Sequence, residues 1–163
     1  MVNKLEEYAH LVIEIGLNVQ KGQYVIINSP VECAPFARLC VKAAYEVGAK
    51  QVIMNWRDDY IGRQYWLNAA DEVFDTIPEY RVRFSTDYAE NNACFLHLVS
   101  SDPENLKGVD PGRLERFQRA CGRQMKRYRE LGMASAFPWS IGALASPAWA
   151  KRVFPDLPEA EAV

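Results

Sequence analysis

Hydrophobic positions recur along this chain at two different spacings, and segments of the two kinds alternate. Helical spacing is clearest over residues 36–47, where hydrophobic side chains form one face that ends before Gly48. Asn3 and Glu6 have the spacing of a capping box at the start of another such segment. The further predicted helices are residues 4–16, 58–66, 71–92 with a break near Pro78, 111–131, and 147–154.

Short runs of β-branched and aromatic residues lie between these helices and predict strands. The runs are residues 23–28, 51–56, 93–100 and 134–141. Pro138 cannot donate a ladder hydrogen bond, which restricts the fourth strand to an edge, an end or a bulge. Strands that alternate with helices favour a mostly parallel sheet covered on both faces. We therefore predict a three-layer α/β fold with about four or more strands, Rossmann-like in architecture, and the pattern leaves the strand order open.

The length and composition suit one globular domain. The chain has 163 residues, of which 49% are hydrophobic and 25% charged. We assign residues 1–155 to that domain. Residues 156–163 carry a helix-start signature, with Asp156 as a cap and Pro158 in the first turn. Because a helix start without a body is marginal in water, we interpret this segment as the beginning of a truncated helix, with a frayed natural terminus as the alternative.

Charge and cysteine usage exclude several classes of partner. The net charge of −2 gives no basic field for nucleic acid or an anionic membrane. The N-terminus lacks a signal peptide, and no apolar run is long enough to span a membrane, so we expect a soluble, cytoplasmic protein. Cys33, Cys40, Cys94 and Cys121 are widely spaced within apolar patterns, and we predict reduced, buried thiols.

A search for catalytic motifs assigns no catalytic or metal-binding residue. The only histidines are His10, predicted on a helix surface, and His97, which lies in an apolar strand and is interpreted as structural. There is no H-E-x-x-H motif, no paired cysteines and no G-x-S-x-G elbow. The turn over residues 28–33 lacks glycine, which excludes a P-loop or dinucleotide fingerprint there.

Two strand ends carry residues suited to a ligand cleft. Trp56, Asp58 and Asp59 follow the second predicted strand, although helix capping is the preferred role for Asp58. Trp139 offers a flat apolar wall to a ligand or partner domain, with core packing as an equal alternative. The basic face of residues 111–131 is interpreted as solvated rather than as a docking site for an acidic partner. Its members are Arg113, Arg116, Arg119, Arg123, Lys126 and Arg127.

Several segments together resemble a known family of enzymes. They are residues 5–22, 29–49, 56–60 and 136–163, the last being the most specific. In their order and spacing they resemble the N-terminal domain of the aminopeptidase T, AmpS and PepS family of metallo-aminopeptidases. The resemblance implies a cytoplasmic, homodimeric exopeptidase that removes N-terminal residues from peptides. It also implies two divalent metal ions, zinc, cobalt or manganese, which activate water and polarise the scissile carbonyl.

The same resemblance limits what this chain does by itself. The family's metal ligands belong to a C-terminal catalytic domain, and no segment here matches their motifs, so no catalytic residue is carried over. We expect the chain alone to be inactive and to wall the substrate cleft of the parent enzyme. Candidate cleft residues are Glu32, Trp56, Asp58, Asp59 and Trp139.

Two other functions remain open at the level of the sequence. One is a free-standing α/β module for protein binding or assembly, with the basic helix or aromatic residues at its surface. The other is a small α/β enzyme that uses His97, for which no nucleophile or orienting acid is apparent.

Overall fold

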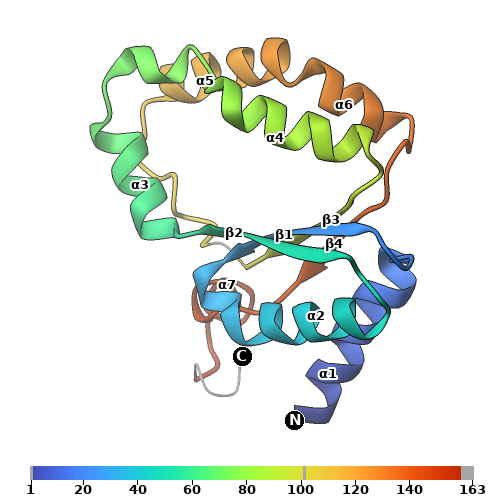
Figure 1. The fold of residues 1–163 in the computed structure, drawn as a ribbon. Coiled ribbons are helices and arrows are strands. Elements are labelled where there is room, and N and C mark those ends of the chain that lie inside the picture. Colours follow the sequence, from blue (N-terminus) through green and yellow to red (C-terminus); the bar gives the residue numbers. More distant parts are fainter. Residues whose placement is uncertain (1, 101, 159–163) are drawn as a thin grey trace.

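A single parallel sheet forms the centre of the molecule, as a computed structural model that describes residues 2–100 and 102–158 shows (Figure 1). The strand order is β2-β1-β3-β4, and every neighbouring pair is parallel. The strands are β1 (Tyr24–Pro30), β2 (Gln51–Arg57), β3 (Cys94–Val99) and β4 (Trp139–Ala143). Helices cover both faces, so the predicted three-layer α/β fold is confirmed.

The lower layer in Figure 1 packs tightly on the sheet. It contains α1 (Val2–His10), the π-helical turn η1 (Leu11–Gly16), the 3₁₀ turn η2 (Val31–Cys33), α2 (Ala34–Glu46) and α7 (Pro147–Val153). The downward side chains of the strands, such as Ile27 and Leu96, join Phe36 of α2 in one buried cluster. This cluster is the main hydrophobic core, and it explains why residues 36–47 show the clearest helical pattern.

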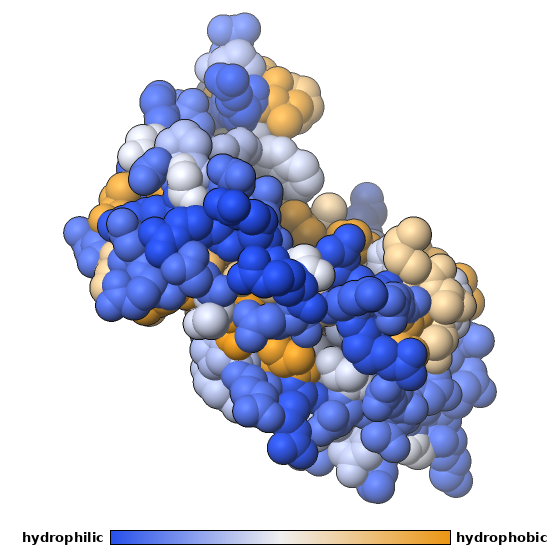
Figure 2. Space-filling model, turned by 90° about the horizontal axis from the view of Figure 1, so that it is seen from above, coloured by the Kyte–Doolittle hydropathy of each residue, from blue (hydrophilic) through white to orange (hydrophobic). Residues whose placement is uncertain are grey.

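The upper layer arches over the opposite face. It contains α3 (Asp59–Asn68), η3 (Asp71–Phe74), α4 (Glu79–Glu90), α5 (Pro111–Gln124) and α6 (Lys126–Met133). A second cluster of Ile26, Phe95 and Phe137, with side chains of α4 and α6, covers only the amino-terminal half of the sheet. Seen from above, this layer is mainly hydrophilic, and its hydrophobic residues form separate patches (Figure 2).

Helices α3 and α5 meet in a corner of their own. Phe74 of η3 is fully buried and stacks on Trp66 of α3, with ring centroids 5.2 Å apart. Phe117 of α5 meets the edge of the same indole ring at 5.2 Å. We call Trp66, Phe74 and Phe117 the aromatic corner. Since its members belong to neither of the two larger clusters, this part of the arch is stabilised locally.

The predicted helix over residues 111–131 is wrong in one respect, because the structure breaks it. Met125 has φ −92° and ψ 15°, ends α5 and begins α6. Helix α5 contacts η3, whereas α6 contacts α4. The bend lets Tyr128 stack on Phe137, with centroids 5.3 Å apart. One straight helix would not reach both partners, so tertiary packing determines the break.

Two predicted boundaries are also wrong. Strand β4 begins at Trp139, directly after Pro138. The Pro138 carbonyl accepts a hydrogen bond of 2.9 Å from the Phe95 N–H. The predicted place of this strand at the edge of the sheet is confirmed. Helix α1 begins at Val2, before the predicted cap position at residue 3. Asp156, the predicted cap, lies in a turn after α7, and residues 159–163 of the predicted truncated helix lie outside the described residues.

Candidate functional site

The upper face of the sheet changes from hydrophobic to polar along its strands. Ile26 and Phe95 face the helices α4 and α6 near the amino-terminal end. Two residues further on, Asn28 aligns with Asn55 of β2 on one side and with His97 of β3 on the other. The Asn55 Nδ2 donates a hydrogen bond of 3.1 Å to the Asn28 Oδ1. Polar side chains thus begin where the helical cover ends.

Arg57 extends this polar row across the sheet. It ends β2, and its Nη2 donates a hydrogen bond of 2.9 Å to the carbonyl oxygen of Leu98 in β3, so the side chain reaches over β1. Burial, and then the positive charge of Arg57, lower the pKa of His97 from its usual value. The imidazole is therefore neutral near neutral pH, and one nitrogen donates while the other accepts.

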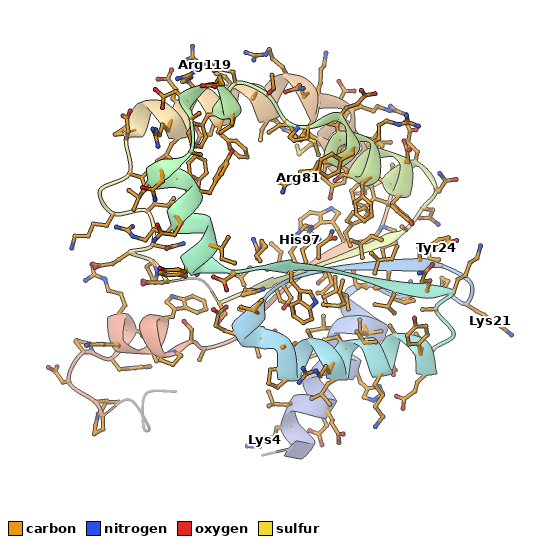
Figure 3. The ribbon with its side chains drawn as sticks, turned by 60° about the vertical axis from the view of Figure 1, so that its left-hand side comes forward. Lys4, Lys21, Tyr24, Arg81, His97 and Arg119 are labelled. Carbon is orange, nitrogen blue, oxygen red and sulfur yellow. The ribbon has the colours of Figure 1, made fainter. Side chains whose placement is uncertain are left out.

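The polar row forms the floor of a hollow whose wall is the first turns of α4. We call it the sheet hollow, and its volume is about 740 Å³. In Figure 3, Arg81 projects from α4 toward this space, and His97 lies on the sheet below it. The residues that line the hollow are Asn28, Met54, Asn55, Trp56, Arg57, Tyr80, Arg81, Phe84 and Ser85.

The charge of the sheet hollow is positive. The Arg81 Nε donates to the Tyr80 hydroxyl at 3.1 Å. Among the described residues, no carboxylate oxygen lies within 4.0 Å of the guanidinium nitrogens of Arg57 or Arg81. Two cations therefore face one concave space without a directly paired carboxylate, although Glu32 and Asp59 lie at the same strand ends, and this arrangement suits an anionic ligand.

Four of the cleft candidates from the sequence gather at the carboxyl ends of the strands. Glu32 lies in η2 directly after β1, and the half-exposed Trp56 lies near the end of β2. Asp58 accepts the Ile61 N–H at 2.9 Å, which confirms its capping role. The Asp59 Oδ2 accepts the backbone N–H of Asp102 at 3.1 Å. Both carboxylates thus order the loops beside the hollow.

Trp139 does not join the other four candidates. It opens β4 opposite Phe95, near the amino-terminal end of the sheet, and it lines a separate surface depression with Asn92 and Pro138. Its side chain is 51% exposed, so core packing does not account for it. The candidates therefore divide between the two ends of the sheet.

Of the residues that line the hollow, the sequence search named only Trp56 as a cleft candidate and missed the others. Asn28 and Asn55 are the fifth residues of their strands, and each stands two positions after an isoleucine, in I-I-N and I-M-N. This shared pattern was the available signal, because a polar side chain at a covered strand position is unfavourable without a partner. Arg81 carries no such pattern, and only the fold brings it to the hollow, above the sheet on which His97 lies.

The described residues do not fit a metal centre. Nowhere in residues 2–100 and 102–158 do three or more histidine, cysteine, aspartate or glutamate side chains converge as metal ligands. His10 lies in the lower layer, where its Nδ1 is 2.7 Å from the Glu14 Oε1, whereas His97 lies on the upper face of the sheet. The two histidines cannot share one ion.

The cysteines are free thiols, as predicted. Burial raises the pKa of Cys40 to about 12 and that of Cys94 to about 11. Cys33 is also buried, and Cys121 is only partly so, which departs from the prediction of four buried thiols. Because a thiolate is the reactive form, Cys40 and Cys94 are structural at neutral pH.

The solvated interpretation of the basic helix face is wrong for three of its arginines. The Arg113 Nη2 lies 2.8 Å from the Asp71 Oδ1, and the Arg116 Nη2 lies 2.5 Å from the Asp75 Oδ2. Arg123 donates to the Asp75 carbonyl at 3.3 Å. The acidic partners of these three arginines are Asp71 of η3 and Asp75 directly after it, while Arg119, Lys126 and Arg127 are exposed, with Arg127 paired to Glu90 of α4.

The neutral state of His97 gives a testable pH dependence. Its folded pKa is lowered, so its contribution to stability is present above the unfolded pKa of about 6.5 and is lost as the pH falls through the folded value. His97→Gln is therefore expected to reduce the loss of stability on acidification. Urea unfolding of both proteins at about pH 7.5 and about pH 5 measures this difference. Equal losses in both proteins would contradict the assignment.

Comparison with known proteins finds similar aminopeptidases and a similar solved structure. The chain is 42% identical over 160 residues to Aminopeptidase AmpS of Bacillus subtilis (strain 168), with 98% of this chain and 39% of that protein covered. It is 36% identical over 159 residues to Aminopeptidase T of Thermus thermophilus, with the same coverage. The solved structure of wild-type AmpT from Thermus thermophilus superimposes with a TM-score of 0.89 at 35% identity, covering 99% of this chain and 41% of that one.

These relatives are much longer than the chain, which spans about 39% of their length. None of the helices among the described residues has the length and apolarity needed to cross a membrane. The family described as Thermophilic metalloprotease (M29) matches residues 1–163. The chain therefore belongs to the M29 family of metalloproteases.

Proposed function

We propose that residues 1–155 are the non-catalytic N-terminal domain of a metal-dependent aminopeptidase, and that residues 156–163 begin the connection to its catalytic domain. The observation that carries this proposal is the family match over the whole chain, combined with coverage of only 39% of the named aminopeptidases. The parent protein removes N-terminal residues from peptides in the cytoplasm, and it acts as a homodimer.

The proposal places the metal chemistry in the C-terminal domain of the same polypeptide. Two divalent ions, zinc, cobalt or manganese, activate water and polarise the scissile carbonyl there. This chain contributes no ligand to them. What it contributes is a rigid parallel sheet whose carboxyl ends form one wall of the substrate cleft, the usual ligand-binding side of an open α/β sheet. Glu32, Trp56, Asp58 and Asp59 lie at that end.

An apolar groove beside α7 supports a contact with the catalytic domain. Ala143 at the end of β4 and Trp149, Val153 and Phe154 line a groove of about 220 Å³. Val153 and Phe154 are half-exposed. An exposed apolar groove of this kind suits burial against another domain. Trp139, at the opposite end of the exposed edge strand, offers a second contact with the same domain.

Aminopeptidase activity provides the test. The chain of residues 1–163 and a protein that continues beyond Val163 are assayed on chromogenic amino-acid substrates with added zinc, cobalt or manganese. We expect hydrolysis by the longer protein only, and its loss when a chelator removes the metal, because the metal supplies the activated water. Metal-dependent hydrolysis by the 163-residue chain itself would contradict the proposal.

A further inference from the structure

We infer that the sheet hollow is a binding site for a carboxylate group, with Arg57 and Arg81 as the charged contacts and the Asn28 and Asn55 amides as neutral ones. The inference rests on the proposed function for its source of ligand, because the substrate of an aminopeptidase is a peptide that ends in a carboxylate. The carboxylate chemistry itself is argued below from the hollow alone.

The position of the hollow in the sheet is the first argument. The chain passes from β1 to β2 on one side and to β3 on the other, so the strand order reverses between β1 and β3. Ligands of open parallel sheets bind in the crevice that such a reversal opens at the carboxyl ends of the strands. Asn28, which lines the hollow, is the register partner of His97 across this reversal, and both side chains are partly buried.

The unused hydrogen-bonding groups of the floor are the second argument. The Asn28 Oδ1 already accepts from Asn55, so the hydrogens on its Nδ2 remain to donate toward the hollow. Polar groups on a partly buried strand face are costly when unpaired, and a ligand oxygen would pair them.

The charges of the two walls are the third argument. The Arg57 Nη2 donates a hydrogen bond to the Leu98 carbonyl oxygen, and this bond fixes the guanidinium over the sheet. The other N–H groups of the guanidinium remain free for a ligand. Arg81 faces the same space from α4. Two cations that share a hollow repel each other, and an anion between them turns this repulsion into attraction. A guanidinium also matches the planar fork of a carboxylate.

The remaining wall favours a carboxylate on an organic body over a free inorganic anion. Phe84 and Tyr80 line the hollow beside Arg81. An aromatic wall next to a guanidinium offers contact area to the side chain that carries the carboxylate, as in the last residue of a peptide. Inorganic phosphate would leave this wall without a partner.

The test is a titration of the 163-residue chain, followed by NMR of its backbone and side-chain amides. The probes are Gly-Gly-Phe with a free carboxyl terminus and the same peptide with a C-terminal amide. We expect saturable shifts of the Asn28 and Asn55 side-chain amides with the free acid only. Arg81→Gln should weaken binding at least about ten-fold, since it removes a charged hydrogen bond.

Arg83→Gln is the matched control. Arg83 lies two residues from Arg81 on α4, is exposed and lies 3.9 Å from Asp87, away from the hollow. This variant should bind as the unchanged chain does. Both arginines are at the surface, so circular dichroism should show the same folded state for both variants. Equal loss of binding in the two variants would overturn the assignment of Arg81.

Further probes in the same titration show whether the bound carboxylate is a peptide C-terminus or an acidic side chain. Gly-Asp-Phe amide presents a side-chain carboxylate alone, and its binding would support the site while assigning it to acidic side chains. Equal binding of the Gly-Gly-Phe amide, or binding of inorganic phosphate without binding of either carboxylate peptide, would overturn the inference. The titration needs no catalysis, so a negative result leaves the aminopeptidase proposal intact, and an inactive longer protein leaves the carboxylate site intact.

Discussion

Phe74→Ala is expected to lower the free energy of unfolding by about 3–5 kcal/mol, the largest change among the substitutions considered. Phe74 is fully buried and stacks on Trp66 with an interplanar angle of 5°. Tyr65 meets the same ring at 5.1 Å. Removing the phenyl ring leaves a cavity between rigid rings, which cannot collapse to fill it. Urea unfolding followed by far-UV circular dichroism measures the loss.

The same substitution should act first on one part of the molecule. The aromatic corner belongs to neither large hydrophobic cluster, so no shared hydrophobic cluster ties α3, η3 and α5 to the sheet. Faster hydrogen exchange is therefore expected in these helices before it appears in the sheet. Val73→Ala is the control, because Val73 adjoins Phe74 in η3 and is partly exposed. Comparable losses from the two substitutions would show that the corner is not a packed unit.

The elements that the sequence predicted well are those that bury one continuous surface. Strands β1 and β3 lie inside the sheet, and their sequences are continuous hydrophobic runs. The reason is that hydrophobic clusters cover both faces of these strands over most of the strand length. Helix α2 packs a single face on that sheet, so its helical spacing is clear. Local periodicity reflects burial directly in such elements, and it needs no knowledge of the partner.

The errors occur where a partner distant in sequence determines the local structure. The break at Met125 depends on η3 and α4, which contact α5 and α6 respectively. The basic face of the same segment was predicted to be solvated because its aspartate partners are distant in the sequence. Arg116 and Asp75, for example, are 41 residues apart. A helical-wheel argument detects a charged face but not the charges opposite it.

The candidate site shows the same limit. Trp56, Asp58 and Asp59 were correctly placed at a strand end, because strand ends follow from the hydrophobic pattern. The sheet hollow was not found, because Arg81 comes from a helix whose packing over β1 and β2 is set by tertiary contacts. Motif searches require fixed spacings, and its residues have none.

Arg113→Ala is expected to lower the free energy of unfolding by about 2–3 kcal/mol, which is large for an arginine near the surface. Its side chain is only 20% exposed. The Nη1 donates to the carbonyl of Trp66 at 2.8 Å, the Nη2 pairs with Asp71, and the guanidinium lies 5.3 Å from the centre of the Phe74 ring. Alanine would leave a backbone acceptor unpaired and uncover the aromatic corner.

Arg119→Ala on the same helix is the matched control, because Arg119 is 62% exposed and pairs only with Glu115 on the surface. Its effect should stay within about 0.5 kcal/mol. Since Arg113 covers the Phe74 ring, the losses from Arg113→Ala and Phe74→Ala should not add, and the double variant should lose less than their sum by about 0.5 kcal/mol or more. Additive losses would mean that Arg113 acts only through Asp71 and Trp66, and that the arginine and the aromatic corner stabilise the arch independently.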